Sequence, residues 1–541
     1  MQTSRLRSWV SENWPLAGAI GVLIVTWVGL FLVMLRETQG RIVYPNSDAY
    51  LRLAMAKNMA LAGSWGVNAG QFASVSGSLL WPLLLAVLFR LFGVYDSIPL
   101  ILNLLLAVVL VGVASRIARR SISSPTLGWL ALVLFIIVVP LAPLALEGME
   151  QVLFLLLVLL FAEQLVAFLG EAQTGRLPVL YVLGVALAST RYEGLLLVGV
   201  GCVLLIWKGK FRIAAGLAVF AAVPAVVYGV ISLHYGWYPV PNTVYFRRAK
   251  LAPSSLRDVP TILLRVFDVL DGRPDLRAVV LVPLLALAWQ SLAGRVTSFR
   301  DIRFQGVVLA LLTVIVHITL VGGRSYAYDA YLVELEWWAS LPLVGQLEGL
   351  RAAQEPSRPN ISILAASLLG LLLLFPPINR GVTAMLQTPG AAREVFDEQD
   401  QLARLAMKCT PGSAVAGDDV GMLAYKGIRA VDLTGVFGMD LARARRAGTL
   451  TPSDLGRVAN MAGIELAFVR DPAVRELVPS AWKSLGTWVV SDCVQCNETG
   501  VGGITTDTTE LYSAKPQDVS RLATCLSNFD LASPSGVTLR P

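Results

Sequence analysis

The chain has 541 residues, of which 55% are hydrophobic and only 15% are charged, and its mean hydropathy is +0.65. Soluble domains have about 45–50% apolar and about 25% charged residues, and the apolar residues here form blocks long enough to cross a bilayer, which takes about 20 residues. The net charge is +7, and basic clusters lie at the ends of these blocks, as expected of cytoplasmic loops. The composition predicts a polytopic α-helical membrane protein and excludes nucleic acid as a partner.

Eleven membrane spans are predicted, with the N-terminus inside and the C-terminus outside. The first span (15–35) is too long for the apolar core of a signal peptide. In the outer loop 36–97, the apolar segment 79–92 is interrupted by Pro82 and too short to cross, so we expect an interfacial or re-entrant helix. The other spans are expected at 98–115, 125–142, 151–169, 177–190, 194–207, 213–233, 276–293, 305–321, 337–350 and 361–377.

The last part of the chain changes character, because the long apolar blocks end near residue 377. Short apolar runs that are typical of strands alternate there with helical stretches, which predicts an external α/β domain. The predicted division is a transmembrane domain over 1–377 and an external domain over 378–541. Strands are expected at 413–416, 430–433, 465–469 and 488–490, and helices at 398–407 and 441–447.

Four of the five cysteines, Cys409, Cys493, Cys496 and Cys525, lie in the predicted external domain. Cysteines outside the cytoplasm favour disulfides, so all four are disulfide candidates. A zinc site is the alternative for Cys493 and Cys496, although no histidine lies near them.

Asp48 is the first candidate for a chemical role. It lies in a polar stretch of the first outer loop, where a carboxylate is costly unless it is solvated or paired. As a general base it would take a proton from an acceptor hydroxyl. The alternative is that it caps a helix that begins near Ala49.

Two further groups of charged residues lie in outer turns. Glu147 and Glu150 form a second acidic site that would tune the pKa of the first acid, hold an acceptor or bind a metal. Alternatively they are solvated, or favourable anions at the start of the next helix. Arg191 and Glu193 either pair with each other in the cavity floor or leave Arg191 to bind a phosphate.

Three cations, Arg247, Arg248 and Lys250, occupy an outer loop, against the positive-inside trend. Either an anionic lipid-phosphate substrate or the lipid headgroups of the bilayer would explain them. His234 at a span end is more typical of an interfacial residue than of a ligand. The sequence has no HExxH motif, phosphate-binding loop, dinucleotide-binding loop or nucleophile elbow, so nothing in it supports hydrolysis by an activated serine or cysteine.

Several short motifs, taken in order, resemble a family of membrane enzymes. The chain is similar to the bacterial GT-C glycosyltransferases that use polyprenyl-phosphate sugars, in particular the arabinofuranosyltransferase-like branch. The motifs are Asn46-Ser47-Asp48-Ala49-Tyr50, Ser76-Gly77-Ser78-x-x-Trp81, Gly148-Met149-Glu150, Thr190-Arg191-Tyr192-Glu193-Gly194, Pro241-Asn242-Thr243 with Lys250, and Val321-Gly322-Gly323.

The resemblance implies an inverting transfer of a sugar, such as arabinofuranose or another pentose or hexose, to an envelope glycan or glycolipid. Asp48 would be the base, and Arg191, Arg247, Arg248 and Lys250 would bind the donor phosphate. No cofactor is implied, and a divalent metal is possible but not required. The enzyme would lie in the bacterial inner membrane, with its site and C-terminal domain facing the periplasm. The pocket would include Tyr50, Trp81, Glu193, His234, Asn242 and Arg324.

The chain departs from the family pattern at three places. Many relatives have two adjacent aspartates where this chain has Ser47-Asp48, so only Asp48 can inherit the role of base. A proline of the relatives is Tyr192 here, and Arg324 replaces an acid that is common after the two glycines. Because of the last change, the resemblance does not identify the donor sugar.

Two alternatives to an enzyme are compatible with the many spans. A transporter or lipid flippase would explain the intramembrane charges, but such folds often contain inverted repeats and paired broken helices, and we find neither. A non-catalytic scaffold protein of envelope synthesis is the other alternative.

Overall fold

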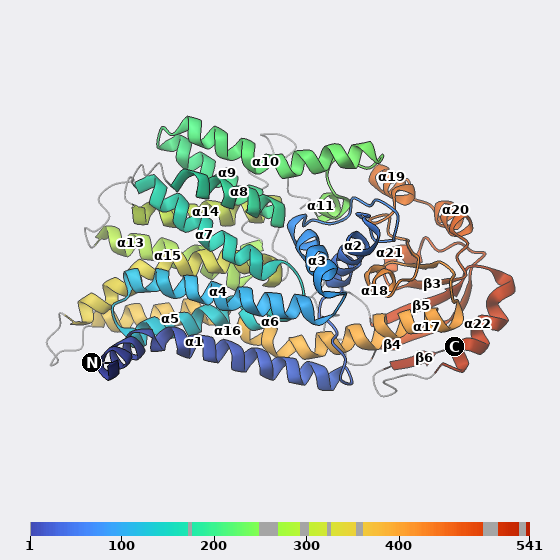
Figure 1. Ribbon diagram of the computed structural model, residues 1–541, viewed down its shortest axis with the longest axis horizontal. Helices are drawn as coiled ribbons and strands as arrows, with labels where there is room; N and C mark the ends of the chain where they lie inside the picture. Colours follow the sequence, from blue (N-terminus) through green and yellow to red (C-terminus); the bar gives the residue numbers. More distant parts are fainter. Residues whose placement is uncertain are drawn as a thin grey trace.

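The computed structural model describes residues 2–170, 176–247, 269–292, 302–321, 326–352, 361–490, 507–529 and 537–540. Long helices run side by side through the larger part of the molecule, and a sheet with short helices lies at one end (Figure 1). The long helices are α1 (Gln2–Glu37), α4 (Ser97–Ser121), α5 (Pro125–Val138), α7 (Gln151–Gly170), α8 (Leu177–Thr190), α9 (Glu193–Trp207), α10 (Phe211–His234), α13 (Pro274–Leu292), α14 (Ile302–Leu320), α15 (Tyr326–Ala352) and α16 (Ile361–Val395).

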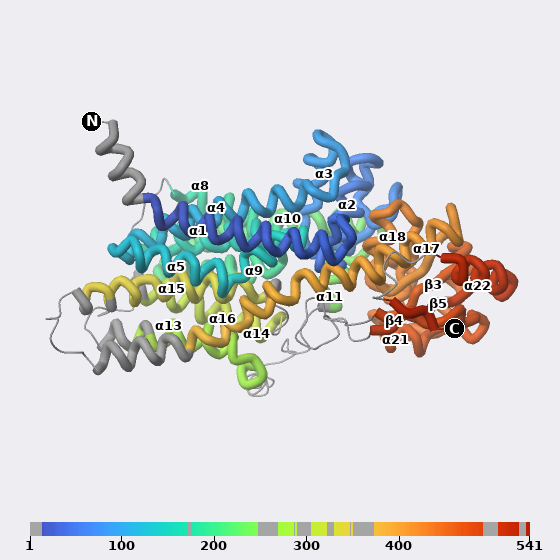
Figure 2. The backbone as a smooth tube through the Cα atoms, turned by 90° about the horizontal axis from the view of Figure 1, so that it is seen from below, coloured from blue at the N-terminus to red at the C-terminus, as the bar shows by residue number. Residues whose placement is uncertain are grey.

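Within the described residues, four of these helices, α1, α4, α7 and α10, are long and apolar enough to cross a membrane. Shorter apolar helices include α5, α8, α9 and most of α14. The predicted class, a polytopic helical protein with a C-terminal α/β region, is therefore confirmed, whereas the number of eleven spans stays a prediction. The helix α16 continues without a break past residue 377 as far as Val395 and leads into the C-terminal region (Figure 2).

The two ends of the helical part are distinguished by their contacts. At the end near the start of α1, the amide of Ser123 donates to Glu348, and Arg120 pairs with Glu163. At the other end, the amide of Leu79 donates to the carbonyl of Ser189 at 2.9 Å. The loops that contain Leu79 and Ser189, both predicted to lie outside, thus meet at the end that carries the C-terminal region (Figure 1).

Short helices lie in the loops that the sequence predicts to be outside: α2 (Asp48–Ala62), α3 (Leu80–Phe92), α6 (Leu141–Leu146) and α11 (Asn242–Arg247). The helix α3 packs on α2 and buries Leu85 and Phe89, whereas Val87 and Leu91 are exposed. An apolar exposed side on a short helix at this end suits the predicted interfacial helix. Its depth in the bilayer stays a prediction.

The C-terminal region contains a six-stranded sheet in the order β2-β1-β3-β5-β4-β6. The strands β2, β1 and β3 are parallel, and the other neighbouring pairs are antiparallel. Strands lie in all four predicted segments. The strands are β1 (Val415–Gly417), β2 (Ala430–Asp432), β3 (Leu466–Val469), β4 (Lys483–Val490), β5 (Thr508–Ser513) and β6 (Val537–Arg540). The helical segments are the π-helical η3 (Phe396–Asp400), α17 (Gln401–Cys409), α18 (Gly421–Tyr425), α19 (Met439–Ala447), α20 (Pro452–Ala462), α21 (Pro472–Arg475), η4 (Pro516–Asp518) and α22 (Val519–Ser527).

Alternate residues of each strand face opposite sides of the sheet. Leu466 and Phe468 of β3 pack in the same hydrophobic core as the helical part, and Ala467 and Val469 pack in a second core with residues of α19 and α20. One side of the sheet thus continues the core of the helical part. A disulfide joins Cys409 to Cys525 and so ties α17 to α22. The other two candidate cysteines, Cys493 and Cys496, lie outside the described residues.

Candidate functional site

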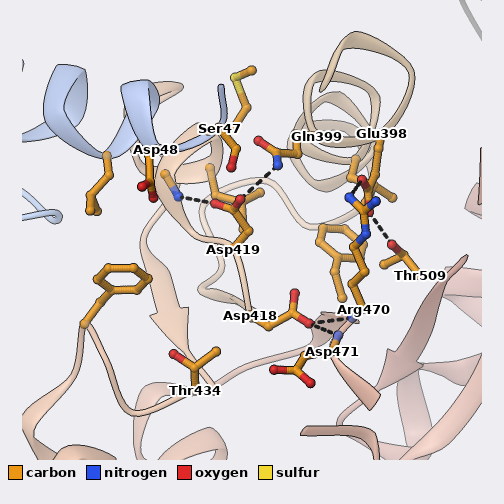
Figure 3. Close-up of a pocket in the computed structure, with 17 residues that line it drawn as sticks. Ser47, Asp48, Glu398, Gln399, Asp418, Asp419, Thr434, Arg470, Asp471 and Thr509 are labelled. Atoms are coloured by element: carbon orange, nitrogen blue, oxygen red, sulfur yellow. Dashed lines mark hydrogen bonds and ion pairs between the residues drawn. The ribbon is translucent and has the colours of Figure 1, made fainter. Parts of the chain in front are cut away.

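Two cavities lie where the first outer loop meets its neighbours. The first, of about 430 Å³, lies between the start of α2 and the C-terminal region; we call it the carboxylate cavity (Figure 3). The second, of about 310 Å³, lies between α2 and the outer ends of the long helices; we call it the guanidinium cavity. The polar lining of the carboxylate cavity is Ser47, Asp48, Glu398, Gln399, Asp418, Asp419, Thr434, Arg470, Asp471 and Thr509. The charged lining of the guanidinium cavity is Arg52, Glu150, Arg191 and Glu193.

Asp48 is the first residue of α2, and it lines the carboxylate cavity. The side chain of Asn46 accepts a hydrogen bond from the Asp48 amide at 3.1 Å, as in an Asx turn. The helix therefore begins at Asp48, one residue before the start assumed in the capping alternative. Figure 3 shows the Asp48 carboxylate in the same cavity as Asp419, which comes from the C-terminal region.

Asp419 follows β1 and faces the first outer loop. Its carboxylate accepts hydrogen bonds from Gln399 Nε2 at 2.9 Å and from the Gly421 amide at 3.2 Å, and it is also hydrogen-bonded to the side chain of Ser47. Burial raises the pKa of Asp419, the bond to Ser47 lowers it, and the negative charge of Asp48 raises it. The two aspartates therefore interact electrostatically between α2 and the C-terminal region.

Asp418 and Glu398 form the deeper part of the carboxylate cavity. Asp418 accepts hydrogen bonds from the backbone amides of Arg470 and Asp471, and the guanidinium of Arg470 pairs with Glu398 and, at 3.0 Å, with Glu394. Burial raises the pKa of Asp418 to about 7 despite these amides, and the nearby charges of Glu398 and Asp419 add to the rise. The carboxylate cavity is thus acidic, and its basic side chain, Arg470, is paired with two glutamates.

The guanidinium cavity contains two ion pairs, of which the first is buried on both sides. Arg52 Nε lies 2.7 Å from Glu150 Oε2, and both side chains are at most 5% exposed. Arg191 Nη2 lies 2.7 Å from Glu193 Oε1, and the Arg191 guanidinium also lies over the ring of Phe154 at 5.4 Å. The remaining lining is mainly apolar and includes Leu196, Val240, Val244, Tyr245 and Leu320. Guanidiniums beside an apolar wall suit a phosphate that carries a lipid chain.

The start of α2 separates the two cavities. Arg52 lies one turn after Asp48 and donates from Nη1 to the Asp48 carbonyl at 2.9 Å. Four residues of helix rise by about 6 Å, so the Cα atoms of these two lining residues lie about one helical turn apart along α2. Asp48 and Arg191 line different cavities, which differs from the single cavity expected from the sequence.

The C-terminal region is held to the outer loops by hydrogen bonds. The side chain of Asn68 both donates to and accepts from the backbone of Ala430, at 2.8 and 3.0 Å. Asn242 donates to the Val436 carbonyl at 3.0 Å and accepts from Arg446 at 2.6 Å. Asn242, a candidate pocket residue in the sequence, is therefore fully buried in a domain contact.

Several other candidates are placed outside both cavities. Tyr50 is buried between the rings of Tyr44 and Tyr425. Trp81 is buried and donates from Nε1 to the Gly148 carbonyl.

The remaining candidates complete this picture. His234 is exposed at the end of α10, and Glu147 is fully buried and lines neither cavity. Arg247 ends α11. Arg248, Lys250 and Arg324 lie outside the described residues.

Sequence reasoning missed Arg52, Gln399, Asp418, Asp419 and Arg470. One signal was available for the aspartates, because two adjacent acids follow a short apolar strand, where ligand sites are common in α/β folds. Arg52 was also visible four residues after Asp48, on the same helical face. Within the described part of the chain, no three His, Cys, Asp or Glu side chains are grouped so that they could hold a metal.

The sequence matches no protein-family profile and no curated protein. Among solved structures, the chain is similar to ArnT from Cupriavidus metallidurans bound to undecaprenyl phosphate. The two share 14% sequence identity with a TM-score of 0.48, over 92% of this chain and 98% of that chain.

Proposed function

We propose that the protein is an inverting membrane glycosyltransferase that moves a sugar from a polyprenyl-phosphate donor to a hydroxyl of an envelope glycan or glycolipid. The observation that carries this proposal is the position of Asp48 and Arg52 on one turn of α2, each lining a different cavity. One cavity offers carboxylates to a hydroxyl, and the other offers guanidiniums and apolar surface to a lipid phosphate. The ordered motifs of the first outer loop and of the segment around Arg191 give the same assignment independently.

In this reaction the acceptor oxygen attacks the anomeric carbon of the donor from the side of Asp48. A new carbon–oxygen bond forms as the bond from the anomeric carbon to the phosphate oxygen breaks. The proton of the acceptor hydroxyl passes to the Asp48 carboxylate, and the electron pair of the broken bond leaves with the polyprenyl phosphate. Arg191 and Arg52 stabilise the charge of that phosphate, and no covalent enzyme intermediate is needed.

The direct test is Asp48→Asn in the purified full-length protein, reconstituted in liposomes with labelled polyprenyl-phosphate pentoses and hexoses. Removal of a general base is expected to lower turnover by about 10²–10⁴-fold with the thermal stability preserved. The matched control is Asp271→Asn, because Asp271 is an exposed carboxylate outside both cavities. A variant Asp48→Asn with the turnover of the wild type would contradict the proposal and favour a transporter or a scaffold.

The second test addresses the donor. Arg191→Gln removes a charge from the guanidinium cavity, so we expect a KM for the polyprenyl-phosphate sugar about tenfold higher, since charged hydrogen bonds contribute about 1.5–3 kcal/mol. An Arg191→Lys variant should recover part of this loss, because lysine restores the positive charge but not the planar guanidinium that can donate two hydrogen bonds to a phosphate. An unchanged donor KM in Arg191→Gln would place the phosphate elsewhere.

A further inference from the structure

The carboxylate cavity has an excess of acidic groups. Among the described residues that line it, Arg470 is the one basic side chain, and it is engaged by Glu394 and Glu398. The acidic lining residues are Asp48, Glu398, Asp418, Asp419 and Asp471. A phosphate or carboxylate placed among them would be repelled, because like charges at short range in a partly buried site oppose each other.

The same cavity offers hydrogen-bond acceptors to a ligand. Gln399 is 8% exposed and lines the cavity; its Nε2 donates to Asp419, whereas its Oε1 has no hydrogen-bond partner among the described residues. A buried acceptor without a partner is costly, and a ligand that brings a donor removes this cost. Ionised carboxylates only accept hydrogen bonds. The lining therefore suits hydroxyl or ammonium groups.

The walls of the cavity are apolar where they do not carry these acceptors. Phe437 and Phe468 line it, together with Leu51 of α2. A sugar ring has hydroxyls at its rim and C–H groups on its faces, so it matches a mixture of acceptors and aromatic side chains. The volume of about 430 Å³ lies within the range of ligand sites, about 300–1,000 Å³.

We propose that the carboxylate cavity binds the acceptor, and that it selects an acceptor sugar with hydroxyl or amino groups and without phosphate or carboxylate at the unit that receives the transfer. Asp419 and Gln399, both beyond the membrane helices, hold this unit beside Asp48. The inference rests on the proposed transfer reaction and adds to it the charge class of the acceptor and the residues that recognise it.

The first test identifies the product. Glycolipids and glycans are extracted from membranes of a strain that lacks the protein and incubated with the reconstituted full-length enzyme and a labelled donor. A disaccharide that consists of the labelled sugar and the unit to which it was attached is then cleaved from the product and applied to an anion-exchange column. We expect a neutral or cationic disaccharide that is not retained; a retained, phosphorylated or uronic acid-containing disaccharide would overturn the inference.

The second test separates acceptor from donor binding. Asp419→Asn should raise the acceptor KM by about tenfold while the donor KM changes much less, because Asp419 lines only the acceptor cavity. Asp440→Asn is the matched control, as an exposed aspartate of α19 outside the cavity, and should leave both KM values unchanged. An equal rise in both KM values, or none, contradicts the inference.

The two proposals fail in different ways. A wild-type protein that neither cleaves nor transfers from any polyprenyl-phosphate sugar refutes the transferase itself. A wild-type protein that transfers normally, with an acceptor KM insensitive to Asp419→Asn, refutes only the acceptor assignment. Thermal unfolding of Asp419→Asn, measured alongside, separates loss of binding from loss of fold.

Discussion

Arg52 and Glu150 form a buried ion pair beside the proposed site of the donor phosphate. The sequence did not predict this pair. Removal of one partner leaves the other charge buried, which typically costs about 3–5 kcal/mol, whereas removal of both is often close to neutral. A double-mutant cycle therefore measures how much of the contribution of Arg52 to stability depends on Glu150.

We predict that Arg52→Met lowers the free energy of unfolding by about 3–5 kcal/mol, and that Arg52→Met/Glu150→Met recovers most of this loss. The measurement is chemical or thermal unfolding of the wild type, Arg52→Met, Glu150→Met and the double variant, side by side in one detergent or nanodisc. If the double variant is as unstable as the single variant, the interaction with Glu150 is not what stabilises Arg52.

At the residue scale, the sequence predicted the chemistry of single side chains better than their partners. Asp48 was identified as a candidate because a carboxylate beside a membrane span is costly unless it is solvated or paired. Its neighbour Asp419 lies in a distant part of the chain, and a single sequence carries no signal for such a contact. The acidic partner expected for Asp48 was Glu147 or Glu150. In the structure Asp419 lines the same cavity as Asp48, and Glu150 pairs with Arg52.

The contact between α2 and α18 depends on a glycine. A Cβ atom added to Gly421 would lie 2.8 Å from the backbone nitrogen of Leu51, closer than non-bonded atoms approach. The close approach allows the start of α18 to lie against α2, and the carboxylate cavity is formed beside this contact.

We expect Gly421→Ala to separate the two helices and to lower both the transfer rate and the unfolding temperature. Overpacking of a tight contact usually costs about 1–3 kcal/mol. Gly438→Ala is the control, because nothing lies within 4 Å of a Cβ at that position. Equal unfolding temperatures and transfer rates for the two variants would show that the close contact is not needed.

The elevated pKa of Asp418 gives the C-terminal region a pH-dependent stability. The pKa is raised from 3.8 to about 7 by burial, so the folded protein favours the protonated form. This contribution to stability is fully present below the unfolded value and is lost as the pH rises through about 7. Glu398, Asp419 and the backbone amides of Arg470 and Asp471 are the groups that face the carboxyl.

We predict that Asp418→Asn, which stays neutral, is more stable than the wild type at pH 8, and that the difference shrinks by pH 5. The measurement is the unfolding temperature of both proteins across this range. A difference that is constant with pH would mean that Asp418 does not titrate with the raised pKa.

Among the helices and strands, short apolar runs predicted strands in four segments. Two of these strands, β1 and β3, place successive residues in cores on opposite faces of the sheet, which explains their uninterrupted apolar runs. The end of the last span was set at residue 377 because the long apolar blocks end there; two prolines, Pro376 and Pro377, which are typical helix breakers, lie at the same place. The structure includes both prolines within α16. The helix continues because tertiary contacts stabilise it where the apolar run has ended. Arg380, for example, pairs with Asp275 of α13.

At the scale of the whole molecule, the disulfide between Cys409 and Cys525 closes a loop with a sequence separation of 116 residues. It encloses most of the C-terminal sheet. In the chain-entropy account, a loop of this length stabilises the folded state by about 4–5 kcal/mol.

The double variant Cys409→Ser/Cys525→Ser is therefore expected to unfold at a lower temperature, with the loss confined to the C-terminal region. Limited proteolysis followed by mass spectrometry locates the first cleavage; we expect it after residue 409. First cleavage within the long helices instead would mean that the disulfide does not govern the stability of this region.

The carboxylate cavity takes its lining from both ends of the chain, from Ser47 near the start to Thr509 near the finish. Asp48 therefore leaves the ribosome long before the residues that face it have been translated. A nascent chain that stops short of β5 lacks part of the lining, so premature termination yields a protein with an incomplete site. Synthesis itself thus delays completion of the cavity until β5 has been translated.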